Sequence, residues 1–347
     1  MSALQAELRR RLWYTILDFL VQSSLDAWMP PRISLDEFDT EPPANISDDK
    51  LDDLMTEVQS CSEGIFTATS VQLALIKTLP VRLQIVQYLN GLHSEVSYDR
   101  VLSLSSELID ALQTCSQWIK NGDGSTPFQR NLLDYVIRRF MIPLHYFFSS
   151  QARANPLFHY SLKLSLDAAF AITSPEPDDG FSRLMTTGGG LFREGIRCAS
   201  SAIGLGLLTH VEMQRLDGTL RRTRQFHDIL KEAIRDLISL SKERIQQGET
   251  NVKNHMFLSM ILAQAEAVEV HGRVELQVAC AARDSLQLCN DIVETIGDAS
   301  SMLSADNPGL AAAPGMEGVQ EFEAFEPEFE WEPFLPGATI FGHGLAW

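Results

Sequence analysis

The sequence is poor in basic residues and in long apolar runs, and each shortage excludes a class of protein. Its 28 lysines and arginines face 46 aspartates and glutamates, which gives a formal net charge of −18. A surface of that sign repels the phosphate backbone of nucleic acids. We therefore expect this chain not to bind DNA by itself. No stretch approaches the roughly 18 uninterrupted apolar residues of a membrane-spanning helix, so we expect no membrane partner.

Cysteine is also scarce, and the few residues present are widely spaced. The five cysteines stand at positions 61, 115, 198, 280 and 289, without a CxxC pair. An odd number without regular spacing is typical of buried thiols in a reducing, intracellular compartment. The histidines are scattered as well, with no HExxH sequence and no cysteine–histidine spacing suited to zinc. We expect no cofactor and no metal in this chain.

Apolar residues recur at helical spacing through most of the chain. In the first segment they fall four residues apart, and the alternation typical of strands is nearly absent. Breaks fall where proline, glycine, asparagine and aspartate cluster. One such cluster, Gly188-Gly189-Gly190, lacks the GK[ST] ending of a phosphate-binding loop and is expected to join two helices. The pattern predicts an all-α fold, an irregular bundle of roughly eight to ten helices joined by short loops.

The composition changes sharply after residue 300. From Asp306 to the end there are eight acidic residues and no lysine or arginine, and aromatic residues alternate with the acids. Such alternation is typical of a disordered activation segment whose aromatic side chains enter a partner's groove, although a solvated terminus without a role fits equally well. We predict an ordered domain over 1–300 and a disordered acidic tail over 301–347. The aromatic residues of the predicted activation segment are Phe322, Phe325, Phe329, Trp331 and Phe334.

One acidic motif could indicate an enzyme. The run Asp48-Asp49-Lys50-Leu51-Asp52 fits the DDxxD pattern with which terpene synthases, which are all-helical enzymes, hold magnesium. Their second metal motif has no match, because Glu294 and Asp298 follow Asn290-Asp291 where a hydroxyl residue and a glutamate are expected. Acids at the start of a helix, which the helix macrodipole favours, are the simpler explanation. We expect no enzyme, and the magnesium-dependent enzyme is kept as an alternative.

Several segments, in order along the chain, resemble the middle homology region of fungal-specific transcription factors. They include the N-terminal run RRRLW, a proline pair, and the stretch 38–45. SPEPDD at 174–179 and GGGLFR at 188–193 resemble the same family. The resemblance extends from about residue 7 to residue 300. Its N-terminal motif positions are Arg9, Arg10, Arg11, Leu12, Trp13, Pro30, Pro31, Asp39, Pro43 and Asn45.

The resemblance implies a function in the nucleus, the regulation of RNA polymerase II transcription. A helical regulatory domain of this kind acts by binding proteins or an effector and carries no catalytic residue. The partners it implies are a coactivator or the transcription machinery. Family members read DNA with an N-terminal module that holds zinc in a six-cysteine cluster. We expect both DNA binding and zinc only in such a module, which this chain lacks.

The chain starts almost at the RRRLW run, so we expect the regulatory domain to be truncated at its N-terminus. A truncated partner protein that does not activate transcription is therefore a further alternative. Helices missing before this run would leave one apolar side of the first helix exposed, and exposed apolar patches favour association. We therefore expect self-association. The residues expected on that helix are Leu8, Leu12, Trp13, Ile16, Leu17 and Leu20.

Overall fold

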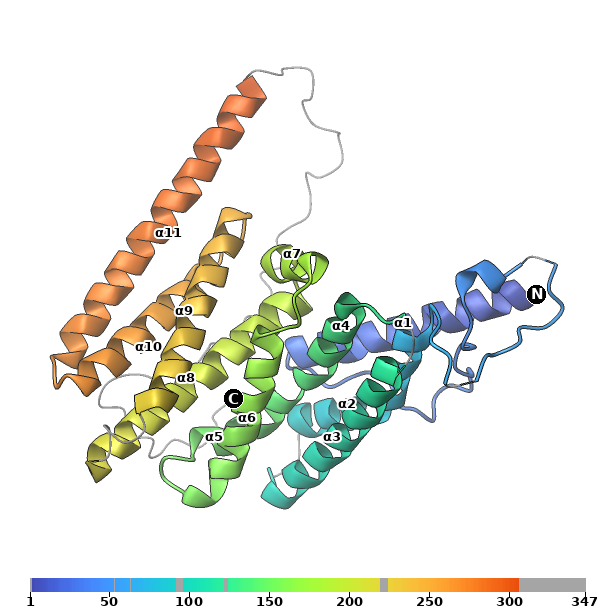
Figure 1. Cartoon of the computed structure of the whole chain (residues 1–347), viewed down its shortest axis with the longest axis horizontal. Coiled ribbons are helices and arrows are strands. Elements are labelled where there is room, and N and C mark those ends of the chain that lie inside the picture. The colour runs from blue at the N-terminus through green and yellow to red at the C-terminus, as the bar shows by residue number, and fades with distance from the viewer. Residues whose placement is uncertain are drawn as a thin grey trace. The chain divides into compact units, whose positions relative to one another are not determined.

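The computed structural model of the protein describes residues 2–52, 54–62, 64–91, 96–121, 124–218 and 224–305 (Figure 1). These residues form eleven α-helices and two 3₁₀ turns and contain no strand. The prediction of an all-α fold is confirmed, with one helix more than the upper expected number. Not every loop is short, because residues 27–69 are irregular apart from the 3₁₀ turn η1 (Asp48–Lys50).

The described residues divide into two compact units: unit 1 holds those up to residue 149 and residues 160–199, and unit 2 holds residues 150–159 and those from 200 on. Helix α8 begins in unit 1 and ends in unit 2. The other helices of unit 1 are α1 (Ala3–Asp26), α2 (Ser70–Asn90), α3 (Tyr98–Asn121), α4 (Pro127–Arg138), α5 (Met141–Ser150), α6 (His159–Thr173) and α7 (Asp179–Thr187). Unit 2 holds the turn η2 (Pro156–Phe158) and the helices α8 (Leu191–Asp217), α9 (Arg224–Gln246), α10 (Lys253–Glu269) and α11 (Val274–Ala305).

Residues 306–347 of the predicted tail, with its five aromatic residues, lie outside the described residues. Helix α11 continues to Ala305, five residues past the predicted domain end. The domain boundary at residue 300 stays a prediction.

An aromatic cluster fixes α4 against α7 and the start of α8. Tyr135 stacks on Phe192 with ring centroids 4.7 Å apart, and its hydroxyl donates to the Phe192 carbonyl at 2.8 Å. Phe181 packs edge-on against both rings. A Cβ atom at Gly195 would lie 2.2 Å from the Tyr135 oxygen, so only glycine admits this packing. The Gly188–Gly190 run joins α7 to α8, as predicted.

A buried histidine lies in the core of unit 1. The two ring nitrogens of His145 are 3.0 Å from the hydroxyls of Ser105 and Ser161. Burial lowers the pKa of His145 to about 4. The ring is therefore neutral at physiological pH, and both its nitrogens are satisfied by hydroxyl groups.

Unit 2 is built on a conventional amphipathic helix, α9. Its buried residues include Leu230, Ile234 and Leu237, at helical spacing, and α9 packs against α10 and α11. Helix α8 comes close to α10 at Gly204, where a Cβ atom would lie 2.5 Å from the Ile261 side chain. Apolar packing with a small residue at the crossing holds this unit together.

All five cysteines are free, but the expectation of buried thiols is confirmed at only two of them. Cys115 in α3 and Cys289 in α11 are buried, and burial raises the pKa of both thiols. Cys61, Cys198 and Cys280 are partly exposed. None of the helices in the described ranges is long and apolar enough to cross a membrane.

Candidate functional site

The structure brings several family-motif positions together around one buried carboxylate, that of Glu7 in α1. This side chain is fully buried. It accepts hydrogen bonds from Arg11 Nε and from the Ala44 backbone N–H, both at 3.1 Å, and Arg10 lies 3.7 Å away. Arg11 also reaches Asp48, with Nη1 2.6 Å from Oδ1. The arginine run therefore ties α1 to the irregular stretch after it.

Two aromatic residues of α1 extend this attachment. The Tyr14 hydroxyl donates to the Thr40 carbonyl at 2.8 Å, and the Trp13 ring packs edge-on against Phe38 at 5.6 Å. A shallow groove runs alongside. The motif positions that line it are Arg9, Arg10, Leu12, Trp13 and Asp39.

Asn45 organises the middle of the irregular stretch. Its Nδ2 group donates to the carbonyls of Ser62 at 3.0 Å and Ile65 at 2.9 Å, and its Oδ1 atom accepts from the hydroxyls of Thr67 and Ser70. An asparagine with two donors and two acceptor sites filled can hold a loop without regular structure.

The other motif positions are separate from these contacts. Pro43 is buried near Asn45, whereas Pro30 and Pro31 follow α1, where neither can continue the helix.

The DDxxD motif does not form a metal site or a long helix. Asp48 and Asp49 lie in the single turn η1, which is too short for the macrodipole explanation to apply. The ion pair with Arg11 accounts for Asp48 instead. Within the described residues, no group of three histidines, cysteines or acids is placed to hold a metal ion.

Helix α1 turns charged as well as apolar residues inward and leaves further apolar residues on its outer side. Asp18 forms an ion pair with the buried Arg82 at 2.6 Å, and Asp26 pairs with the buried Arg139. Gln22 lies 3.2 Å from Arg139, and burial lowers the pKa of that guanidinium to about 10, so it is still charged at neutral pH.

The expected exposed apolar side of α1 is present. Leu8, Leu12 and Ile16 are 49%, 60% and 47% exposed. Of the other residues named for this helix, Leu17 is buried and Trp13 and Leu20 are half-buried, whereas Phe19, which was not named, is 58% exposed. We call Leu8, Leu12, Ile16 and Phe19 the outer stripe.

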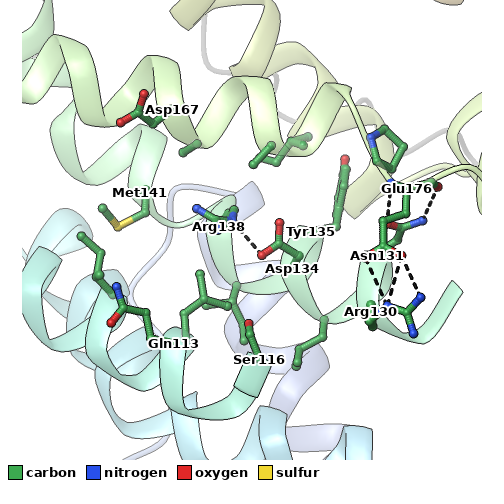
Figure 2. Close-up of a pocket in the computed structure, with 18 of the residues that line it drawn as sticks. Gln113, Ser116, Arg130, Asn131, Asp134, Tyr135, Arg138, Met141, Asp167 and Glu176 are labelled. Atoms are coloured by element: carbon green, nitrogen blue, oxygen red, sulfur yellow. Dashed lines mark hydrogen bonds and ion pairs between the residues drawn. The ribbon is translucent and has the colours of Figure 1, made fainter. Parts of the chain in front are cut away.

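A second groove of unit 1, of about 600 Å³, lies between α3 and α6, with α4 as its floor (Figure 2). Its apolar lining comes from all three helices and includes Leu112, Ile137 and Ala168. In its middle Arg138 Nε donates to Asp134 at 2.7 Å. Sequence reasoning missed this groove, because its residues come from separate helices and form no motif.

One end of the groove is closed by the segment between α6 and α7. Glu176 in that segment pairs with Arg130 of α4, with Nη2 2.7 Å from Oε2. The neighbouring Asn131 donates to the Glu176 carbonyl at 2.8 Å and accepts from the Glu176 N–H at 2.9 Å. These contacts, which we call the Glu176 clamp, join the SPEPDD segment to the floor of the groove (Figure 2).

Three relatives show what the chain is similar to. It is 44% identical to the transcription factor asR3 of Sarocladium schorii, over 96% of this chain and 44% of the relative. It is 32% identical to the transcription factor lepE of Aspergillus flavus, over 84% of this chain and 38% of the relative. The aspyridones cluster regulator apdR of Emericella nidulans is 28% identical, over 85% of this chain and 43% of the relative.

The chain thus spans less than half the length of each of these relatives. No family model matches the chain, and no solved structure matches it. Similarity at this level over nearly the whole chain indicates common descent. The relatives are transcription factors and not enzymes, so the magnesium-dependent alternative has no support. The chain belongs to the same family as these fungal transcription factors.

Proposed function

We propose that this chain is the regulatory segment of a nuclear transcription factor that controls a fungal biosynthetic gene cluster. The observation that carries the proposal is the 44% identity to asR3 over 96% of the chain. The name of apdR describes a cluster regulator, and its alignment covers 85% of this chain. The segment acts on RNA polymerase II transcription by binding proteins or an effector.

DNA binding belongs to another part of such a transcription factor in this proposal. The net charge of −18 opposes contact with phosphates. Zinc would be held there as well, since the cysteines of this chain are isolated. The proposed partners of the chain itself are a coactivator or another part of the transcription machinery.

The acidic tail is the proposed contact with the coactivator. Its aromatic residues would supply the binding energy by entering an apolar groove, and its glutamates would keep the segment soluble and speed the encounter. No single glutamate should then be essential, whereas the aromatic residues should be.

A reporter assay in a fungal strain tests this function. The full chain, fused to an unrelated DNA-binding domain, should activate transcription. Replacing Phe325, Phe329 and Trp331 together by alanine should abolish activation, whereas Glu326→Gln should change it little. A silent fusion of a stably expressed chain would contradict the proposal. Equal activity of the triple variant would contradict the role of the tail.

A further inference from the structure

The groove between α3, α4 and α6 has the dimensions of a ligand site. Its volume of about 600 Å³ lies within the range of roughly 300–1,000 Å³ that is usual for small-molecule pockets. Small side chains leave the space open: Ser116 on α3 and Ala168 and Ala171 on α6 line the walls. Large apolar residues from all sides surround this space, so an apolar ligand body would be buried in it.

The polar groups of the groove favour an acidic ligand. Three acids line it, and each has a basic partner: Asp134 pairs with Arg138, Glu176 with Arg130, and Asp167 with Lys163, which lies outside the lining. The lining also includes Lys120, which forms no close ion pair within the described ranges. The lining itself holds as many basic groups as acids, and Lys120 is the basic group of the lining that no acid pairs with closely in the described part of the chain.

Arg138 is placed to orient such a ligand. Its Nε group donates to Asp134, while neither of its Nη groups has a partner among the described residues. Figure 2 shows the guanidinium in the middle of the groove, between the walls formed by α3 and α6. Two Nη groups in one plane match the two oxygens of a carboxylate.

The geometry points to a binding site for a small, mainly apolar molecule that carries one carboxylate or similar acidic group. The apolar body would lie between α3 and α6, against the half-buried Ile109 and Leu164. The acidic group would accept hydrogen bonds from the Nη groups of Arg138. Binding of this ligand is independent of the proposed function, and only its regulatory consequence rests on it.

The regulatory effect of ligand binding would be transmitted through the Glu176 clamp. Arg130 and Asn131 line the groove and also hold the segment that leads into α7. A ligand that changes the position of α4 relative to α6 would therefore change the strain on this segment. The reporter fusion of the full chain should then respond to such a ligand.

Two fluorescent probes with almost the same aromatic skeleton test the site on the full chain. 8-Anilinonaphthalene-1-sulfonate carries an acidic group, and N-phenyl-1-naphthylamine is neutral. Both should bind saturably with one site per chain. Ser116→Trp fills the groove and should weaken both probes about tenfold or more. Thr114→Trp is the matched control, because Thr114 is exposed on the same helix and does not line the groove; it should bind like wild type.

Arg138→Gln separates the polar contact from the apolar one. It should weaken the sulfonate about tenfold and leave the neutral probe within about twofold of wild type. Arg183→Gln, on the exposed surface of α7, should change neither affinity. Circular dichroism should show that each variant is folded.

Three results would overturn the site. They are the absence of saturable binding to wild type, equal affinities of Ser116→Trp and Thr114→Trp, and equal effects of Arg138→Gln on both probes. None of them depends on the reporter assay, so failure of the site and failure of the proposed function are distinguishable.

Discussion

Helices α1 and α9 are both long, and both bury apolar side chains together with ion pairs, but the two helices supply opposite members of those pairs. Helix α9 buries Leu230, Ile234 and Leu237, and its buried Lys231 pairs with Glu269 of α10. Helix α1 also buries apolar residues, but it directs Asp18 and Asp26 toward buried arginines and leaves its outer stripe in solvent. Each helix is therefore held by apolar contacts and by ion pairs, and the two kinds of contact can be tested separately.

The two kinds of attachment differ in how they respond to change. Apolar contacts lose free energy roughly in proportion to the area that is removed. A buried ion pair contributes little when it is intact, but losing one partner leaves an unpaired buried charge. The same number of deleted atoms should therefore cost more at an ion-paired position such as Asp26 than at an apolar position such as Ile234.

The largest effect is expected from Asp26→Ala. Among the described residues, the change leaves Gln22 as the one hydrogen-bond partner of the buried Arg139, so the free energy of unfolding should fall by about 3–5 kcal/mol. Urea denaturation measures it. The double variant Asp26→Leu with Arg139→Met removes both charges and should recover most of the loss. A double variant as unstable as Asp26→Ala would show that charge is not the cause.

A smaller loss is expected from Ile234→Ala on α9. Removing buried methyl groups should cost about 3 kcal/mol, through lost burial and the cavity that is left. Because no charge is involved, the cost in urea denaturation should be the same at 50 mM and 500 mM salt. A stability cost that depends strongly on salt would contradict the contrast between this apolar contact and the ion pair of Asp26.

Lowering the pH protonates His145 and so introduces a charge into the core of unit 1 without a mutation. The pKa of His145 is about 4 in the folded chain and about 6.5 when unfolded, so the unfolded chain binds the proton more readily between these values. Its contribution to stability is complete above pH 6.5 and is lost as the pH falls through 4. The loss should reach at most about 3 kcal/mol. Denaturation of His145→Gln across this pH range should show a shallower slope, and an unchanged slope would contradict the assignment.

The smallest effect on stability is expected on the outer stripe. Leu12→Gln should change the free energy of unfolding by no more than about 0.5 kcal/mol, because Leu12 is already exposed. It should nevertheless reduce self-association, which exposed apolar stripes favour. Sedimentation velocity of wild type and variant measures this. A wild-type chain that stays monomeric at high concentration would contradict self-association through this stripe.

Periodicity was enough to predict the helical fold and the exposed side of α1. It could not predict what α1 turns inward, because the partners Arg82 and Arg139 lie 64 and 113 residues from Asp18 and Asp26 along the chain. The contacts that hold the irregular stretch after α1 could not be predicted for a similar reason, because the partners of Asn45 are polar residues that follow no sequence pattern.

The groove depends on the spacing between three helices, which no local sequence signal encodes. The tail prediction concerns residues outside the described part and is tested only by the reporter assay.

The two buried thiols can serve as built-in probes of local stability. Cys115 lies in unit 1 and Cys289 in unit 2, and the raised pKa of each keeps the unreactive protonated form at neutral pH. Either thiol can be alkylated only when its surroundings open. In a pulse of iodoacetamide followed by peptide mass spectrometry, the rate at each position would therefore report the opening of its own unit. The two alkylation rates then report the opening of each unit separately, without any added label.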